Sequence, residues 1–335
     1  MLEADECGRG PSGRNGGFLH GYWSHLPRLR ERFGDAGALA VARASEAIVP
    51  GVRAFCEREN ADVWLREAGM LRVSAAPAQD GSVEDEVVAA RELGVSEEAV
   101  PLTREELAER IRSPRFRQGV FLRDGATVQP ARLALSLRRK ALATVRLHER
   151  SLVTSIEDGR VETELGRVRA RDVVVAVNAA AAGWKPLRRR LTVFGSYVVL
   201  TEPVPELLER IGWTGGEAVF DGRMFLHYFR TTNDGRVLMG SGSGPIGFGG
   251  KIDRRFTEDE PTVARAERGL RKLLPDLADA KVTHAWGGPI DVSGFHVPFF
   301  GSLARGNVHY GLGYTGNGVG PAHLGGRRLL PVAGA

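Results

Sequence analysis

Cysteines and long apolar runs are scarce in this sequence of 335 residues. The two cysteines, Cys7 and Cys56, form no Cys-x-x-Cys pair and no cluster with histidine. We therefore expect no metal site, and so few thiols favour a reducing compartment. No apolar run approaches the roughly 20 residues that span a bilayer, and the N-terminus has no basic segment followed by an apolar one. These absences predict a cytoplasmic protein without a membrane span.

Concentrated positive charge is also missing, although the formal net charge is +5, from 46 Lys and Arg against 41 Asp and Glu. The densest basic runs, at 138–140 and 188–190, contain no aromatic residue. A nucleic-acid-binding surface would gather basic residues in one stripe, so we expect no nucleic-acid partner. With 42% hydrophobic residues, the composition is that of an ordinary globular protein, long enough for two domains.

The spacing of apolar residues predicts helices mainly in the first half of the chain and strands mainly in the second. Helices are predicted at 36–60, 82–94, 102–111, 129–143 and 257–277, and a strand at 69–75. The segments 191–203, 217–230 and 235–242 are β-rich and alternate as in a half-buried sheet. Pro50 should kink or divide the first helix, because proline cannot donate the helical hydrogen bond. The helix at 102–111 carries a capping box, with Thr103 as N-cap and Glu106 three residues on.

Turn residues and a long apolar run alternate in the stretch 152–183. Asp158-Gly159 and Leu165-Gly166 predict turns between three short strands. The last strand of this meander is predicted at the continuous apolar run Val173–Val177, which is typical of a strand that is buried on both faces. Asn178 follows this run, at the place where a loop after a buried strand would meet a ligand.

Two stretches match the spacing Gly-x-Gly-x-x-Gly. The stretch 242–247 follows a strand but precedes no convincing helix, so we interpret it as a glycine-rich loop that leaves a sheet. The stretch 311–316 lies between a strand and a helix, whose terminal amides can bind a ligand. It leaves no room for a βαβ unit, so it is not a primary dinucleotide fingerprint, and a tight turn packed by glycines is the alternative interpretation.

The chain opens with Leu2-Glu3-Ala4, a pattern typical of a strand end, and continues into a glycine-rich loop. In a doubly wound nucleotide-binding fold, an acid at the end of the second strand binds the adenosine ribose, and the phosphate-binding glycines precede it by about 20 residues. Glu3 fits that acid. On this interpretation the first strand and its glycines would lie before residue 1, and we expect that Met1 is not the biological start.

Several motifs, in the same order, resemble flavin-dependent amine and amino-acid oxidoreductases, the superfamily of D-amino-acid oxidase, glycine oxidase and sarcosine oxidase. The motifs are LEADECGRGPSGRNGGFL, VTSIEDGRVETELGRVRARDVVVAVNAAAAG, YFRTTNDGRVLMGSG, AWGGPIDVSGFHVPFFG and GLGYTGNGV. The stretch SGRNGG resembles the subgroup of gamma-glutamylputrescine oxidase-like enzymes. The last two motifs contain no cysteine for a covalent bond to flavin, so the resemblance implies FAD bound non-covalently.

The resemblance implies an α/β fold, α+β overall, with two domains. A Rossmann-like FAD-binding domain that lacks its first strand and glycine loop would comprise residues 1–56, 129–190 and 291–335. A substrate domain built on a mixed sheet would comprise residues 57–128 and 191–290. The N-terminal truncation and the short C-terminal helix are departures from the family pattern.

The resemblance also implies which residues contact FAD. Glu3 would hold the adenosine ribose, and Val153 would present its backbone to adenine. The residues along the pyrophosphate and the flavin would be Ser12, Arg14, Asn15, Gly16, Gly17, Asn178 and Ala179. Those beside the flavin pyrimidine ring would be Gly313, Tyr314, Thr315, Gly316, Asn317 and Gly318. A helix N-terminus at that position stabilises negative charge on the reduced flavin.

The reaction implied is oxidation of the C–N bond of a small amine or amino acid by hydride transfer to flavin N5, giving an imine and H2O2. On the substrate side, Arg230 would bind a carboxylate through its planar guanidinium, Tyr228 would orient the amine, and Trp286 would wall the pocket. Two alternatives are a non-catalytic remnant of the family and a flavin dehydrogenase that passes electrons to a carrier instead of O2. The sequence does not fix the amine or the oligomeric state.

Overall fold

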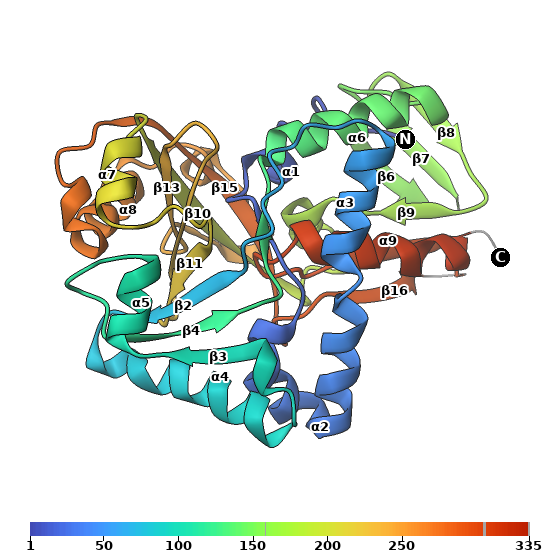
Figure 1. Cartoon of the computed structure of the whole chain (residues 1–335). Coiled ribbons are helices and arrows are strands. Elements are labelled where there is room, and N and C mark those ends of the chain that lie inside the picture. The colour runs from blue at the N-terminus through green and yellow to red at the C-terminus, as the bar shows by residue number, and fades with distance from the viewer. Residues whose placement is uncertain (158, 304–305, 334–335) are drawn as a thin grey trace.

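Two groups of elements lie side by side in the computed structural model, which describes residues 1–157, 159–303 and 306–333. One group, on the left of Figure 1, is a large sheet with helices on its faces, and the other contains long helices and small sheets. Asp158 of a predicted turn, and positions 304–305 and 334–335 of the predicted FAD-binding domain, fall outside the described residues.

A nine-stranded mixed sheet forms the first group. Its strands are β2 (Met70–Ser74), β3 (Ala99–Leu102), β4 (Gln118–Leu122), β10 (Leu191–Thr201), β11 (Ala218–Asp221), β12 (His227–Thr231), β13 (Val237–Ser241), β14 (Ile246–Gly247) and β15 (Val282–Ser293). Their order is β14-β10-β13-β12-β11-β2-β4-β3, and β15 also pairs with β10. β11 and β2 are parallel, and the other neighbours are antiparallel. The sheet thus joins strands from two distant parts of the chain.

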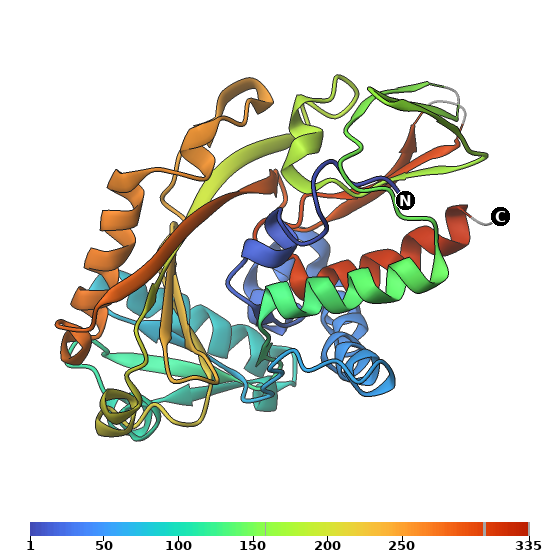
Figure 2. The ribbon, with the colours of Figure 1, turned by 90° about the horizontal axis from the view of Figure 1, so that it is seen from above.

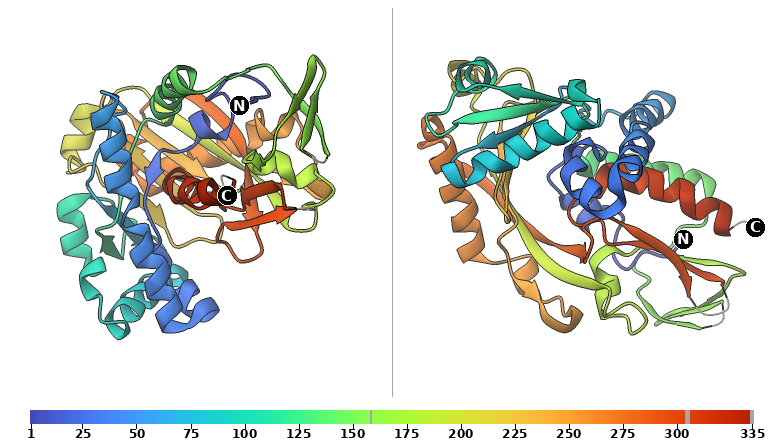
Figure 3. Two further views of the ribbon diagram at one scale, coloured as in Figure 1. Left: turned by 90° about the vertical axis from the view of Figure 1, so that its right-hand side faces the viewer. Right: turned by 90° about the horizontal axis from the view of Figure 1, so that it is seen from below.

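Side chains alternate between the two faces along each strand, so both faces carry apolar residues. Helices cover one face and the part of the other face that β2, β3, β4 and β11 form. Leu71 and Phe229 lie in the core on one face, and Met70 and Val120 lie in the core on the other. The helices on the first face are α5 (Arg104–Arg110), α7 (Pro205–Arg210) and α8 (Glu260–Leu273), and those on the second are α2 (Leu26–Ser45) and α4 (Asp80–Glu92). Figure 3 shows α4 lying across β3 and β4.

The ends of two helices follow from local sequence. α5 begins with the predicted capping box, in which Thr103 Oγ1 accepts a hydrogen bond from the backbone N–H of Glu106 at 3.2 Å and the Glu106 carboxylate accepts one from Thr103 at 2.8 Å. The prediction of one helix over 257–277 is wrong at both ends. α8 starts after the cap Asp259 and stops at Leu273, because Pro275 disfavours helical geometry at the residue before it.

The predicted helix at 36–60 is divided in the structure, as Pro50 indicated. α2 ends at Ser45, and α3 (Ile48–Arg58) begins after a short turn. Pro50 lies in the first turn of α3, where a backbone N–H has no helical partner in any case, so proline costs little there. α2 starts ten residues earlier than predicted and is kinked at Gly34, whose φ is +67°.

Two small sheets lie in the second group of elements. The three-stranded meander predicted in 152–183 is confirmed as an antiparallel sheet, except that its last strand is not the run Val173–Val177. That run belongs to a separate sheet, whose order is β16-β17-β9. The meander strands are β6 (Val153–Glu157), β7 (Arg160–Thr163) and β8 (Gly166–Arg169), and the others are β9 (Val173–Val175), β16 (Phe299–Leu303) and β17 (Val308–Leu312). β9 and β17 are parallel, and α9 (Val319–Ala333) packs against both.

The prediction that Val173–Val177 is a strand buried on both faces is wrong. β9 ends at Val175, and the side chains of Val174 and Val177 are 46% and 50% exposed. Within the described ranges, β9 has β17 as its one paired neighbour, and α9 covers a single face. An apolar run therefore marks the strand here, but its second face remains open to solvent.

The start of the chain crosses from the second group toward the large sheet. Leu2 forms a parallel bridge with His148, and the backbone N–H of Glu3 donates to the His148 carbonyl at 2.9 Å. The short helix α1 (Pro11–Arg14) then lies between β15 and α6 (Pro130–Thr144), as Figure 2 shows. Beyond it, β1 (Phe18–Leu19) pairs with β5 (Ala126–Thr127).

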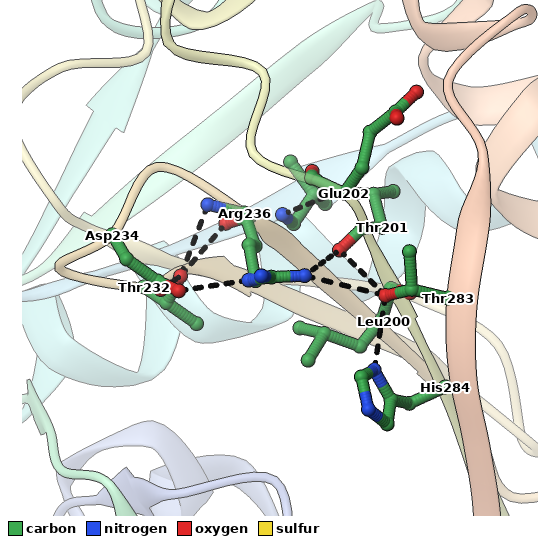
Figure 4. A network of polar contacts seen from close by, with 9 residues as sticks. Leu200, Thr201, Glu202, Thr232, Asp234, Arg236, Thr283 and His284 are labelled. Atoms are coloured by element: carbon green, nitrogen blue, oxygen red, sulfur yellow. Dashed lines mark hydrogen bonds and ion pairs between the residues drawn. The ribbon is translucent and has the colours of Figure 1, made fainter.

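A polar network fixes the turn between β12 and β13 (Figure 4). The Arg236 guanidinium donates to the Thr201 carbonyl at 3.0 Å and to Thr283 Oγ1 at 3.3 Å, and it pairs with Asp234 at 2.7 Å. The backbone N–H of Arg236 donates to Thr232 Oγ1 at 3.0 Å. The turn is thereby bound to β10 and β15, which holds β12 in a fixed register.

Candidate active site

The loop that follows α1 is held in shape by Asn15. Its side-chain amide donates to the carbonyls of Pro11 and Ser12 at 3.0 and 2.9 Å, and its Oδ1 accepts from the backbone N–H of Gly17 at 2.8 Å. Gly17 has a φ of +76°, and a Cβ on it would overlap the carbonyl oxygen of Val128. Only glycine fits this position, because a side chain would clash and strain the backbone.

Three side chains of the large sheet contact this loop. Arg230 Nε donates to the Gly16 carbonyl at 2.5 Å, and Trp286 Nε1 donates to the Arg14 carbonyl at 2.7 Å. The Tyr228 ring lies so close to Gly16 that a Cβ on this glycine would be 2.7 Å from Cε2 of the ring. The structure therefore brings together the three residues predicted on the substrate side and the loop predicted to contact the cofactor.

Arg230 is a buried cation without an acidic partner in the described chain. The residue is only 4% exposed, and its Nη1 donates to the Thr231 carbonyl at 3.1 Å. Burial lowers the pKa of Arg230 to about 10, so the guanidinium remains charged at neutral pH. Among the described residues, Nη2 has no hydrogen-bond partner, and it lies beside Gly17.

Tyr228 lies on the same face of β12 as Arg230, two residues away. Its hydroxyl shares a hydrogen bond with Ser196 Oγ at 2.8 Å, and its ring packs edge-on against Phe18. Burial raises the pKa of Tyr228, so the phenol stays neutral at physiological pH. A neutral hydroxyl fixed in this way can donate or accept a hydrogen bond.

Asp291 connects two segments that the sequence predicted at the cofactor. Its Oδ1 accepts from Asn178 Nδ2 at 2.9 Å, and its Oδ2 accepts from the backbone N–H of Gly313 at 2.5 Å. Its own carbonyl accepts from the N–H of Thr315 at 2.8 Å. Asp291 is fully buried, and burial raises its pKa to about 6. We did not predict this residue from the sequence, although a lone acid within an apolar strand was a usable indication, because acids are rarely buried without partners.

Two residues in these segments have left-handed backbones. Asn178 has a φ of 50° and Thr315 a φ of 54°, values that few non-glycine residues adopt. Local hydrogen bonds stabilise both. The N–H of Ala179 donates to Asn178 Oδ1 at 2.7 Å, and Thr315 Oγ1 donates to the Gly313 carbonyl at 3.0 Å. Such conformations often occur at ligand-binding sites.

The turn 313–318 leads directly into α9 and carries polar atoms that lack partners. Asn317 Nδ2 donates to the Gly21 carbonyl at 3.3 Å, but its Oδ1 is buried with no hydrogen-bond partner in the described part of the chain. The buried hydroxyl of Tyr22 likewise has none there. Tyr314 lies nearby, and burial raises its pKa to about 12. Unsatisfied buried polar atoms beside a helix N-terminus are suited to a polar ligand.

The residues predicted at the adenosine lie apart from this cluster. Glu3 is half-buried, and its carboxylate accepts from the backbone N–H of Asp5 at 3.1 Å. The N–H of Ser151 donates to the Glu3 carbonyl at 2.8 Å, which brings Glu3 close to Val153 at the start of β6. Ser12 is exposed in α1. No hydrogen bond joins Glu3 or Val153 to the Asp291 cluster in the described ranges.

Comparison with known proteins identifies the family. The family model described as "DAO: FAD dependent oxidoreductase" matches residues 1–330. The chain belongs to this family. Members are FAD-dependent oxidoreductases, so the resemblance stated from the sequence motifs is confirmed.

Curated relatives of this DAO-family chain are oxidoreductases from bacteria. It is 29% identical to a probable oxidoreductase OrdL of Rhizobium meliloti, over 99% of this chain and 76% of the relative. It is 28% identical to gamma-glutamylputrescine oxidoreductase of Escherichia coli, over 99% of this chain and 77% of the relative. The sequence similarity to both relatives covers nearly all of this chain.

Solved structures support the same fold. The DAO-family chain superposes on glycine oxidase from Geobacillus kaustophilus with a TM-score of 0.80 at 22% identity, covering 99% of this chain and 86% of that one. Iminodiacetate oxidase from Chelativorans sp. gives a TM-score of 0.71 at 17% identity, covering 96% and 85%. The expected α/β architecture with a large mixed sheet is therefore confirmed, whereas the division into two domains stays a prediction.

The unsatisfied polar atoms near the start of α9 fit FAD in this DAO-family chain. Asn317, whose buried Oδ1 is unsatisfied among the described residues, lies two residues before the start of α9, and the buried Tyr22 hydroxyl is likewise unsatisfied there. Unsatisfied polar atoms near a helix N-terminus suit the polar edge of a flavin. Within the described ranges, no helix is both long and apolar enough to cross a bilayer.

Proposed function

We propose that this protein oxidises the C–N bond of a small amine or amino acid, using non-covalently bound FAD and passing the electrons to O2. The observation that carries the proposal is the contact of Tyr228, Arg230 and Trp286 with the glycine loop at 14–17. A substrate held by those side chains would lie against a flavin held by that loop. The names of the relatives, an oxidoreductase of a glutamylated diamine and oxidases of glycine and iminodiacetate, support the same class of substrate.

The residues proposed to hold FAD fall into three groups. Glu3 and Val153 would bind the adenosine, and the pyrophosphate and flavin would run along Ser12, Arg14, Asn15, Gly16, Gly17, Asn178 and Ala179. The pyrimidine edge would meet Gly313, Tyr314, Thr315, Gly316, Asn317 and Gly318. FAD, when bound, supplies N5 as the acceptor of a hydride from the carbon that bears the nitrogen. The N-terminal amides of α9 would stabilise the negative charge that develops on reduction.

Arg230, Tyr228 and Trp286 would orient the substrate and exclude water from it. Arg230 offers Nη2 to a carboxylate, because its Nε and Nη1 are engaged by carbonyl groups. Tyr228, fixed by Ser196, would hydrogen-bond the amine, and the Trp286 ring would close the pocket. The amine would lose a hydride and a proton to become an imine, which water hydrolyses, and two electrons would reduce O2 to H2O2.

The test combines flavin reduction with peroxide release. The purified protein, loaded with FAD, is mixed without oxygen with primary amines, glutamylated diamines, glycine and iminodiacetate, and the visible flavin absorption is followed. Bleaching by one of these, with H2O2 formed on admission of air, is the expected result. Bleaching without peroxide would show that an electron carrier, and not O2, accepts the electrons. No bleaching by any member of the panel would refute the proposal.

The variant Arg230→Gln tests the substrate side. It keeps a side-chain N–H donor but removes the charge, so we expect the KM of carboxylate-bearing substrates to rise by about tenfold or more. Simple amines are the matched control, and their kcat/KM should stay within about threefold of wild type. Equal losses for both substrate classes would show that Arg230 does not bind a carboxylate.

A further inference from the structure

The structure assigns to Asp291 a positioning role, in which one carboxylate joins the loop at Asn178 to the turn at 313–315. The inference rests on the proposed function only in that these segments would border FAD. Asp291 is fully buried on β15, and each of its oxygens serves a different segment. The sequence separates Asn178 from Asp291 by 113 residues, so this contact is purely tertiary.

Each hydrogen bond in this cluster has a fixed donor and a fixed acceptor. Asn178 uses its Oδ1 for the N–H of Ala179, and only its Nδ2 is directed to Asp291. Gly313 donates its N–H to Oδ2, so both carboxylate oxygens face donors. An amide at position 291 would place an N–H group against one of those donors. A buried donor without an acceptor is costly, so the carboxylate is specified by its neighbours.

Backbone contacts that do not involve this carboxylate also hold β15 against the turn at 313–315. Val292 and Tyr314 form an antiparallel bridge, and the Thr315 N–H donates to the carbonyl of Asp291 rather than to its side chain. These contacts do not depend on the identity of the side chain at 291. The variants below are therefore expected to fold, with a turn that is less well held.

A reciprocal exchange isolates the role of the pair. In Asp291→Asn, the new amide N–H faces either Asn178 Nδ2 or the Gly313 N–H, both of which are donors. In Asn178→Asp, the new carboxylate faces the carboxylate of Asp291. The double variant restores every bond. The new carboxylate at position 178 would accept from Ala179 and from the new amide at position 291, whose own oxygen would accept from Gly313. Asparagine and aspartate both tolerate the left-handed backbone at 178, so the exchange adds no strain there.

The measurements are the dissociation constant of FAD, by quenching of flavin fluorescence, and the free energy of unfolding without FAD, by urea denaturation. Each single variant is expected to weaken FAD binding, and to lower the folding equilibrium constant measured without FAD, by about tenfold or more. The double variant is expected to return the folding equilibrium constant to within about threefold of wild type, but to recover FAD affinity only in part, because position 178 is itself proposed to lie along the pyrophosphate. Single variants that bind FAD like wild type would overturn the inference. So would a double variant no better than the weaker single variant.

The same four proteins separate this inference from the proposed function. If wild type binds no FAD, the coupling between the two positions is read from the unfolding free energies alone. A coupling equal to about a tenfold change in the folding equilibrium constant supports the inference that Asp291 joins the two segments. Strictly additive effects of the two substitutions contradict it. If Asp291→Asn is insoluble, a soluble double variant supports the inference and an insoluble one counts against it.

Discussion

At the scale of single residues, Asp291 shows opposing influences on one carboxyl group. Burial raises its pKa, whereas hydrogen bonds from Gly313, Tyr314 and Asn178 lower it, and the balance places the pKa at about 6 instead of the usual 3.8. The groups that face it are an amide, backbone N–H groups and the Tyr314 phenol, whose pKa near 12 keeps it neutral. Between pH 4 and pH 6, Asp291 therefore dominates the change of charge in this cluster.

The raised pKa predicts how folding stability depends on pH. The folded state holds its proton more tightly than the unfolded state, so the contribution of Asp291 is fully present below the unfolded pKa and is lost as the pH rises through about 6. We expect the unfolding free energy of wild type, relative to Asp291→Asn, to fall between about pH 4 and pH 6.5 and to level off above that. The measurement is urea denaturation of both proteins across this range.

The non-titrating variant Asp291→Asn is the control for every other acid in the chain, since those acids are common to both proteins. A difference between the two proteins that is constant with pH would contradict the raised pKa. A difference that grows with pH would mean that the hydrogen bonds outweigh burial and that the pKa is lowered.

At the scale of helices and strands, the capping box of α5 is an element that local sequence specifies and the structure reproduces. Thr103→Ala removes the hydroxyl that accepts the Glu106 N–H. We expect the free energy of unfolding to fall by about 1 kcal/mol, because α5 carries the fully buried Leu107 into the core of the sheet. Thr103→Ser keeps the acceptor and should lie close to wild type. Equal stability of the alanine and serine variants would show that the cap is not stabilising.

Elements with local determinants were predictable from the sequence, and those set by tertiary packing were not. The capping box, the break near Pro50 and the meander depend on residues a few positions apart, which a sequence displays directly. The exposure of β9 depends on which strands and helices lie beside it, and Val173–Val177 contains no trace of that. Pro275 marks the end of α8, whereas the apolar periodicity continues past it and favours a longer helix.

The candidate site divides in the same way. The ordered motifs predict the glycine loop, Asn178 and the turn at 313–318 as site residues, and the resemblance together with a shared strand face predicts Tyr228 and Arg230. Asp291 was missed because its importance arises from a partner 113 positions away. The engagement of Arg230 by backbone carbonyls was equally invisible, since a carbonyl partner leaves no mark in the sequence.

At the scale of the whole molecule, the ligand proposed here would join distant parts of the chain. Glu3 and Val153 lie with the meander, whereas the turn at 313–318 lies at the start of α9. A ligand that contacts both ends stabilises the folded state by about 2.7 kcal/mol when its free concentration is about 100 times its dissociation constant. We expect FAD to raise the melting temperature measured by differential scanning fluorimetry.

FMN is the matched control for this prediction, because it contains the flavin but lacks the adenosine that Glu3 and Val153 would hold. At equal concentration it should raise the melting temperature much less than FAD. Equal increases in melting temperature with FAD and FMN would show that these two residues do not bind the adenosine. No increase with either ligand would contradict flavin binding by this chain.

The two adjacent glycines of the loop have a consequence for recognising proteins of this type. Gly16 is confined by the Tyr228 ring, and Gly17 by the Val128 carbonyl and the Arg230 guanidinium, all of which belong to the polypeptide itself. Selection for a stable apoprotein alone would preserve both glycines. A lineage that had lost catalysis would therefore keep this signature, and a pattern search based on it would count such descendants among the flavoenzymes.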